Sequence, residues 1–141
     1  MADAVGGEGG IRVSMILVVD DDPGVRFMLR LILESAGHEV VEAAHGAAAL
    51  NLISPRRLPD VVVTDLMMPV LGGEELIGHL RAAPATATIP IVVVSGNAVA
   101  AWSLKASGLV EAVVSKPFDA AKVTQCIHAV ANRASTRPRV A

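Results

Sequence analysis

Three consecutive carboxylates, Asp20, Asp21 and Asp22, end an apolar run in the segment MILVVDDDPGVR. Each pair of like charges at contact distance costs about 1 to 4 kcal/mol, depending on the local dielectric. Such a cluster therefore needs a positive partner. Asp22 has an ordinary explanation, because it can cap a helix whose first residue is Pro23. Capping uses one carboxylate, so Asp20 and Asp21 remain to be explained by chemistry.

Three further polar residues stand where other apolar runs end. Asp65 follows DVVVT, Ser95 follows IPIVVV, and Lys116 follows EAVVS. Each residue alone is unremarkable at the end of a strand. Together with Asp20 and Asp21 they form a set of hard oxygen ligands with a cation. Such an incomplete cage suits Mg²⁺, which takes one or two carboxylates, keeps several waters and completes its shell with phosphate oxygens.

The elements that must position these residues alternate between strand and helix. Helical periodicity follows each of five short β-branched runs, which predict strands near residues 15–20, 39–43, 60–65, 89–95 and 111–115. The first helix is predicted to end at Gly37. Its predicted buried face carries Val25, Met28, Leu29, Ile32 and Ala36.

Strands that are apolar on both faces and alternate with helices pair in parallel through right-handed crossovers. The predicted fold is therefore α/β: a doubly wound, five-stranded parallel sheet with helices on both faces. Ligands of such sheets bind beyond the carboxyl ends of the strands. We expect the polar residues that end the strands to share one rim of the sheet.

The composition describes one globular domain. The chain has 141 residues, of which 52% are apolar and 18% charged. We predict a flexible Gly-rich leader over residues 1–13, one domain over 14–132 and a basic, disordered tail over 133–141. No apolar run approaches the roughly 20 residues of a membrane span, which predicts a cytoplasmic protein without membrane contact. A formal net charge of −2 gives no reason to expect nucleic-acid binding.

The single cysteine and the four histidines are predicted to have no chemical role. Cys126 has no cysteine partner and no zinc-type spacing, so we expect a small core residue on a helix. The histidines are expected to be scattered surface or helix residues with no metal-binding pair: His38, His45, His79 and His128.

The ordered motifs resemble the receiver domains of two-component response regulators. The resemblance covers roughly residues 16–131. It rests on ILVVDDDPGVR, on D-x-x-M-P-x-x-x-G from Asp65 to Gly73, on VVVSGNA around Ser95 and on SKPF around Lys116. Each motif is weak by itself, whereas the ordered set is specific. The resemblance implies a flavodoxin-like (βα)5 receiver fold.

The resemblance also implies a phosphoacceptor. Asp65 would attack the phosphoryl group of a phosphohistidine on a sensor histidine kinase or a histidine phosphotransfer protein. The implied Mg²⁺ ligands are Asp21 directly, Asp20 mostly through water, Asp65, and the backbone carbonyl of Met67.

Ser95 and Lys116 are the implied contacts of the phosphoryl group, with a cis peptide bond before Pro117. Phosphoryl transfer needs in-line positioning and charge neutralisation more than acid or base chemistry. Lysine serves as a compact point charge in such a site. The implied protein is a signalling phosphoacceptor rather than an enzyme, and bound Mg²⁺ would offset the repulsion among its acids.

Three positions leave the family pattern or have no assigned role. Many receivers carry an aromatic residue where Val113 stands, so the usual relay between hydroxyl and ring is in doubt here. Met67 is apolar and cannot orient a hydrolytic water, which predicts slow self-dephosphorylation. Trp102 has two interpretations, a partly buried packing residue or an anchor for an unidentified downstream partner.

Alternative functions stay open. A hydrolase with an aspartyl-phosphate intermediate would place D-x-D after the first strand, and a flavin-binding module would place a Ser/Thr/Gly-rich phosphate loop there. The segment DDDPG resembles neither. A pseudo-receiver would bind partners without phosphorylation. Nothing long enough for an output domain follows residue 131, which predicts a stand-alone receiver or one excised from a larger kinase.

Overall fold

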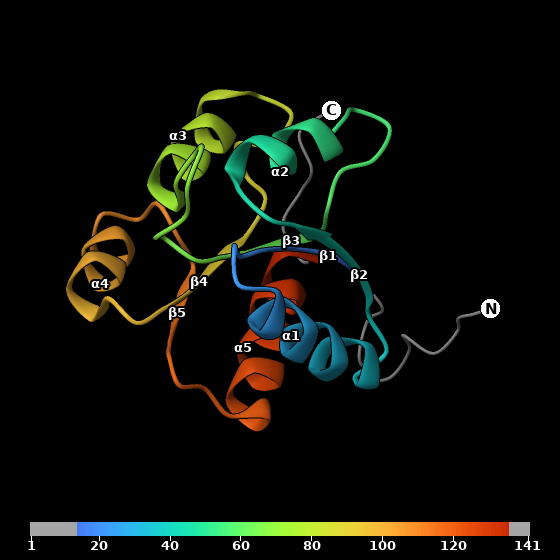
Figure 1. The fold of residues 1–141 in the computed structure, drawn as a ribbon. Coiled ribbons are helices and arrows are strands. Elements are labelled where there is room, and N and C mark those ends of the chain that lie inside the picture. The colour runs from blue at the N-terminus through green and yellow to red at the C-terminus, as the bar shows by residue number, and fades with distance from the viewer. Residues whose placement is uncertain (1–13, 136–141) are drawn as a thin grey trace.

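The computed structural model describes residues 14–135; the predicted leader at 1–13 and residues 136–141 lie outside the described part. Five strands and five helices alternate along the described chain (Figure 1). α5 extends past residue 132, where the sequence predicts the domain to end. The elements are β1 (Met15–Val19), α1 (Pro23–Ser35), β2 (Glu39–Ala43), α2 (Gly46–Leu52), β3 (Val61–Thr64), α3 (Gly73–Ala82), β4 (Ile91–Ser95), α4 (Ala98–Ala106), β5 (Ala112–Ser115) and α5 (Ala120–Ser135).

The strands form one parallel sheet in the order β2-β1-β3-β4-β5. β2 lies on one side of β1, and the later strands β3, β4 and β5 lie on its other side. The boundary between β1 and β3 is therefore the switch point at which ligands of such sheets bind. Asp20 follows β1 and Asp65 follows β3, and the Asp65 N–H donates to the Val19 carbonyl at 3.0 Å. The predicted doubly wound fold is confirmed.

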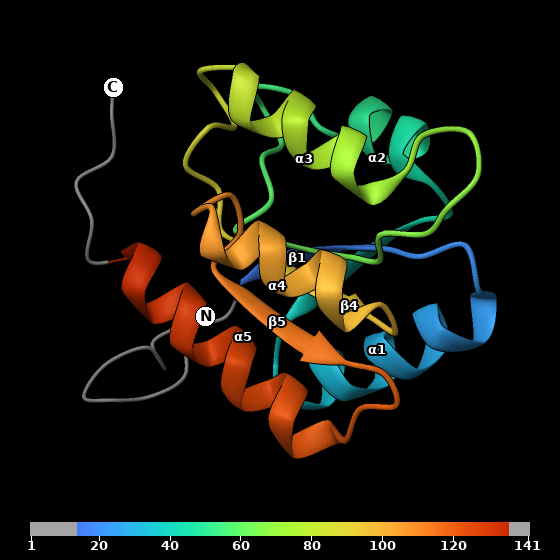
Figure 2. The same cartoon turned by 90° about the vertical axis from the view of Figure 1, so that its left-hand side faces the viewer.

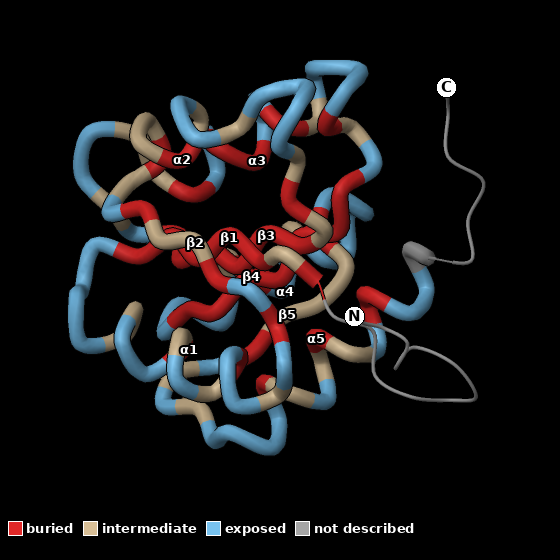
Figure 3. Tube along the Cα trace, turned by 90° about the vertical axis from the view of Figure 1, so that its right-hand side faces the viewer, coloured by how far each residue is buried: buried red, intermediate tan, exposed pale blue. Residues whose placement is uncertain are grey.

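Helices cover both faces of the sheet and create two apolar layers. α1 and α5 lie on one face, and α2, α3 and α4 lie on the other (Figures 1 and 2). Within β1, Ile16 and Val18 belong to the first layer, while Leu17 and Val19 belong to the second. Burial is concentrated in the strands and the inner sides of the helices (Figure 3). Within residues 14–135, no helix is long and apolar enough to cross a membrane.

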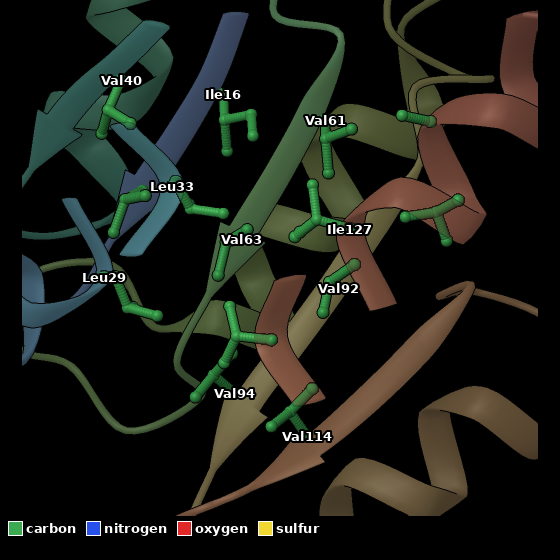
Figure 4. Close-up of a cluster of buried hydrophobic side chains, with 14 residues drawn as sticks. Ile16, Leu29, Leu33, Val40, Val61, Val63, Val92, Val94, Val114 and Ile127 are labelled. Carbon is green, nitrogen blue, oxygen red and sulfur yellow. The ribbon is translucent and has the colours of Figure 1, made fainter. Parts of the chain in front are cut away.

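The layer under α1 and α5 is built from close-packed aliphatic side chains. Figure 4 shows Leu29 and Leu33 of α1 on one side of the sheet residue Val63, with Ile127 of α5 nearby. Burying each such side chain contributes about 1.5 to 3 kcal/mol. The sheet is therefore a rigid base for the loops at its carboxyl edge.

α1 begins as the sequence predicts, and Val25, Leu29 and Ile32 pack in the core as predicted, whereas Met28 does not. Asp22 caps the helix by accepting from the N–H groups of Gly24 and Val25 at 2.8 and 3.4 Å, and Pro23 is the first helical residue. The predicted core residue Met28 is 49% exposed, and Leu33 is buried in its place. Leu33 lies one helical turn after the buried Leu29, so the two residues share one face of the helix. Met28 lies outside that face.

Cys126 lies on α5 and is half-buried against the layer of α1 and α5, as predicted. Burial raises the pKa of its thiol, although the charges of Arg133 and Lys105 oppose this. The thiol therefore stays protonated at neutral pH, consistent with a packing role.

His38 is a buried residue rather than the expected surface histidine, being 4% exposed. Its Nδ1 accepts from the Ser14 N–H at 3.3 Å, and its Nε2 lies 3.1 Å from Nε2 of His128 on α5. Burial lowers the pKa of His38, and the charge of His128 lowers it further, against an opposing effect of Asp60. The two histidines connect the start of β2 to α5, and protonation of a ring would disturb the contact between their Nε2 atoms.

The buried His38 makes stability depend on pH near neutrality. The folded-state pKa lies below the ordinary 6.5, so the unfolded chain binds the proton more readily. The contribution of neutral His38 to the free energy of unfolding is fully present above about pH 6.5. It is lost as the pH falls, by at most about 1.4 kcal/mol per pH unit for one proton. Urea unfolding at a series of pH values should show this slope, and His38→Gln should reduce it.

The matched control is His79→Gln, because His79 is an exposed histidine on α3. That variant should keep the wild-type slope of unfolding free energy against pH. An unchanged slope in His38→Gln would contradict the assignment to His38.

Candidate functional site

Three carboxylates meet at the carboxyl edge of the sheet: Asp20, Asp21 and Asp65. One oxygen from each lies within 4.8 Å of the others. Asp20 and Asp65 are buried, at 1% and 7% exposure, whereas Asp21 is exposed. Two anions are thus held away from water next to a third. This arrangement costs several kcal/mol per buried ion unless positive charge lies close by.

Lys116 brings a cation to the cluster from the end of β5. Its Nζ donates to Asp20 Oδ2 and to Asp65 Oδ2, at 3.0 Å in each case. Its backbone N–H donates to the Ser95 carbonyl at 3.0 Å, and the peptide bond to Pro117 is cis, as predicted. Burial alone would lower the pKa of Lys116, but its bonds to the two carboxylates raise it by more. The ammonium therefore stays charged at neutral pH.

The electrostatic environment of Asp20 disfavours its ionised form. Burial raises the pKa of Asp20, while a hydrogen bond of 2.9 Å from the Asp22 N–H and the contact with Lys116 act to lower it. The net shift is upward, so the ionised carboxylate is less stable here than in water. A second cation beside Asp20 would reduce this penalty, and the electrostatics therefore favour a bound metal ion.

Backbone contacts hold Asp65 at the end of β3. The Leu66 N–H donates to Asp65 Oδ1 at 2.6 Å, while Lys116 binds the other oxygen. The Gly73 N–H donates to the Leu66 carbonyl at 3.0 Å, which presses the first turn of α3 against this segment. A Cβ at Gly73 would overlap the Asp65 carbonyl oxygen and lie 2.7 Å from the Cα of Leu66. The glycine of the D-x-x-M-P-x-x-x-G motif is thus explained by close backbone approach.

The donor set fits a hard divalent cation. The cluster offers only carboxylate oxygens, and an exposed Asp21 leaves one side open for water ligands. The triad of Asp20, Asp21 and Asp65 can therefore bind a metal ion. The part of the Met67 carbonyl as a further ligand stays a prediction.

Ser95 lies at the end of β4, fully buried and next to Lys116. Its Oγ accepts from the Asn97 N–H at 3.0 Å, and Asn97 Oδ1 in turn accepts from the Ala100 N–H at 3.1 Å. The hydroxyl is therefore tied to the start of α4 while its own hydrogen is available for donation. Its contact with a phosphoryl group stays a prediction.

The α4 side of the molecule carries exposed apolar side chains. Trp102 is 54% exposed, and Lys105 Nζ lies 5.4 Å from the centre of its ring. Val99 on the same helix is 82% exposed. Val113 is partly buried in the layer of α2, α3 and α4 and pairs with Val93 of β4. About half of the Trp102 surface is thus accessible to a partner, and the rest is covered by the protein.

One residue of the site region went unrecognised in the sequence. Arg26, in the second turn of α1, donates from Nη1 to the Asp20 carbonyl at 2.7 Å and from Nε to Glu42 Oε1 at 3.0 Å. The only signal in the sequence is an arginine five positions after Asp21, which by itself indicates a solvated helix residue.

A family model for the response regulator receiver domain matches residues 16–128. The chain belongs to this family. An uncharacterized 14.6 kDa protein in the sodA1 3' region of Leptolyngbya boryana is 43% identical over 83 residues, covering 59% of this chain and 63% of that protein. The sensor histidine kinase TmoS of Ectopseudomonas mendocina is 38% identical over 106 residues, covering 74% of this chain and 11% of the kinase. The chain thus spans less than two thirds of either relative.

Solved structures agree with this assignment. A putative response regulator from Chloroflexus aurantiacus superposes with a TM-score of 0.79 at 32% identity, covering 86% of this chain and all of that one. The chemotaxis response regulator CheY4 of Vibrio cholerae gives 0.75 at 26% identity, covering 84% and 99%. The described chain is a receiver domain with an acidic pocket of Asp20, Asp21 and Asp65 beside Lys116, which is consistent with a phosphoacceptor function. This assignment speaks against the flavin-binding and hydrolase alternatives.

The close approach at Gly73 can be measured. Gly73→Ala should destabilise the receiver by about 1 to 3 kcal/mol, because the new methyl group must displace backbone atoms of Asp65 and Leu66. Gly78→Ala is the matched control on the same helix, since nothing lies within 4 Å of its Cβ position. The control should stabilise by about 0.5 to 1 kcal/mol. Urea unfolding of both variants checks this; equal stability would contradict the packing argument.

Metal binding can be separated from folding at Asp21. Mg²⁺ at one hundred times its dissociation constant should raise the free energy of unfolding by about 2.7 kcal/mol. Asp21→Asn should remove most of this gain. The exposed side chain predicts metal-free stability within about 0.5 kcal/mol of wild type. Thermal unfolding in Mg²⁺ and in EDTA measures both quantities.

The control for this experiment is Glu74→Gln, which removes an exposed carboxylate of α3 outside the triad. The Mg²⁺ effect should survive in that variant. Loss of the Mg²⁺ stabilisation in Glu74→Gln, or its persistence in Asp21→Asn, would argue against a metal site at the triad.

Proposed function

We propose that Asp65 accepts a phosphoryl group from a phosphohistidine on a sensor histidine kinase or a histidine phosphotransfer protein. The observation that carries this proposal is the convergence of charge on Asp65. Lys116 binds its Oδ2 at 3.0 Å, and Asp20 and Asp21 lie within the same 4.8 Å cluster. A buried carboxylate with a fixed cation and two further metal-type ligands is suited to receive a phosphoryl dianion.

In the proposed transfer, a carboxylate oxygen of Asp65 attacks phosphorus while the phosphorus–nitrogen bond to the histidine breaks. The imidazole nitrogen leaves with the electron pair, and the product is an aspartyl phosphate. Asp65 attacks as a carboxylate, so no neighbouring base has to remove a proton from it. The hydrogen bond from the Leu66 N–H orients the carboxylate for this attack.

The chain's own residues neutralise the incoming charge. Lys116 stays protonated and lies next to Asp65, so its ammonium can follow the phosphoryl oxygens. The Ser95 hydroxyl is proposed to donate to one of those oxygens. Mg²⁺, when bound, would supply the remaining positive charge. Its proposed ligands are Asp20, Asp21, Asp65 and the Met67 carbonyl.

Loss of the phosphoryl group is proposed to be slow. The Met67 side chain is 69% exposed beside the site and carries no group that could orient a hydrolytic water. The signal is proposed to pass to an unidentified protein target in the cytoplasm, without nucleic-acid binding by this domain. Val113 excludes a swinging aromatic ring at that position, so the output uses other contacts.

The proposal is tested by intact-protein mass after incubation with acetyl phosphate and Mg²⁺. Wild type should gain one phosphoryl group, and Asp65→Asn or EDTA should abolish the gain. Asp22→Asn is the matched control, because it removes a neighbouring carboxylate while asparagine keeps the helix cap. That variant should still be phosphorylated.

Two results would contradict the proposal. An adduct that survives in Asp65→Asn would place the acceptor elsewhere. A folded wild type that gains no adduct would favour the pseudo-receiver, in which the same pocket serves partner binding without phosphorylation.

A phosphoryl lifetime of seconds after removal of the donor would contradict only the proposed slow self-dephosphorylation.

A further inference from the structure

Arg26 connects the acidic cluster to the edge strand β2. Its guanidinium is largely buried, with 18% of the side chain exposed. Nη1 donates to the Asp20 carbonyl at 2.7 Å, and Nε donates to Glu42 Oε1 at 3.0 Å. One planar group thus holds two acceptors at the same time, one just after β1 and one in β2, a geometry that suits arginine.

The Asp20 carbonyl belongs to the peptide that joins two of the three carboxylate residues. It lies just beyond Val19, the last residue of β1 that pairs with β2. The Asp20 N–H still bonds to the Ala43 carbonyl at 3.1 Å, but the Asp20 carbonyl takes its hydrogen bond from Arg26. This contact fixes the plane of the Asp20–Asp21 peptide. The directions in which both side chains leave the backbone follow from that plane.

The charge of Arg26 is balanced locally. Glu42 accepts from Arg26 and, through its other oxygen, from Arg30 Nη1 at 2.9 Å. Arg30 also contacts Glu34 at 3.3 Å, so two guanidinium groups face two carboxylates. A lone arginine next to the triad would repel a metal ion, whereas this neutral set can hold the peptide with little such cost.

We propose that Arg26 is a positioning residue for the metal site, holding the Asp20–Asp21 peptide so that both carboxylates face Asp65. The inference rests on the proposed metal binding of the triad and deepens it. Outer-shell partners of metal ligands typically change metal affinity by about 10- to 100-fold when removed. Arg26 acts here on the backbone between two ligands rather than on a ligand atom.

The test compares Mg²⁺ affinities of the folded proteins by titration calorimetry, with circular dichroism confirming the fold at the titration temperature. Arg26→Gln should weaken Mg²⁺ binding by about tenfold or more. Arg30→Gln is the matched control, because it removes the other guanidinium on Glu42 and leaves the Asp20 carbonyl bonded. The control should stay within about twofold of wild type.

The sign of the effect separates positioning from simple electrostatics. Arg26→Gln removes a positive charge near the triad, which by Coulomb's law alone would tighten Mg²⁺ binding. Weaker binding therefore supports positioning. Arg26→Lys keeps the charge but cannot hold two acceptors with one planar fork, so it should bind Mg²⁺ less well than wild type and better than Arg26→Gln. This variant decides the question if Arg26→Gln does not fold.

Unchanged or tighter Mg²⁺ binding in Arg26→Gln, or equal weakening in Arg30→Gln, would overturn the positioning role. The proposed function would stand in either case, provided that wild type binds Mg²⁺ and is phosphorylated. A wild type that binds no Mg²⁺ would remove the proposed metal site itself, and the role of Arg26 with it.

Discussion

The architecture of the site depends on negative charge that is held out of water. Asp20 and Asp65 are buried because they follow two adjacent interior strands of a sheet that is covered on both faces. Three features stabilise the buried carboxylates. The ammonium of Lys116 and backbone N–H groups donate hydrogen bonds to both of them, and the geometry of the triad can accommodate a metal ion.

Backbone groups as well as charged side chains position this site. Gly73 lets α3 approach the Asp65 carbonyl, and the Leu66 N–H orients the Asp65 carboxylate. Arg26 acts on the carbonyl of Asp20 rather than on its carboxylate. Groups that carry no chemistry of their own therefore determine where the reactive oxygens lie, and they do so through short contacts in well-packed surroundings.

Local sequence patterns predicted the features that local physics determines. β-branched runs identified the strands, the DDDPG segment identified the cap at Asp22, and parallel topology brought Asp20 and Asp65 to one rim. The contact between His38 and His128 joins residues 90 positions apart and leaves no periodic signal. Met28 was misplaced for a related reason, because several apolar residues of α1 could form its inner face and packing against the sheet selects among them.

Lys116 and its carboxylate partners follow different strands of the sheet. The acids follow the interior strands β1 and β3, whereas the lysine follows β5, which is an edge strand and the last strand within residues 14–135. The first three strands alone would bring Asp20 and Asp65 together without their internal counter-ion. The two buried carboxylates gain their ammonium partner only when β5 docks onto β4. The strand that completes the sheet thus also carries the internal counter-ion of its active edge.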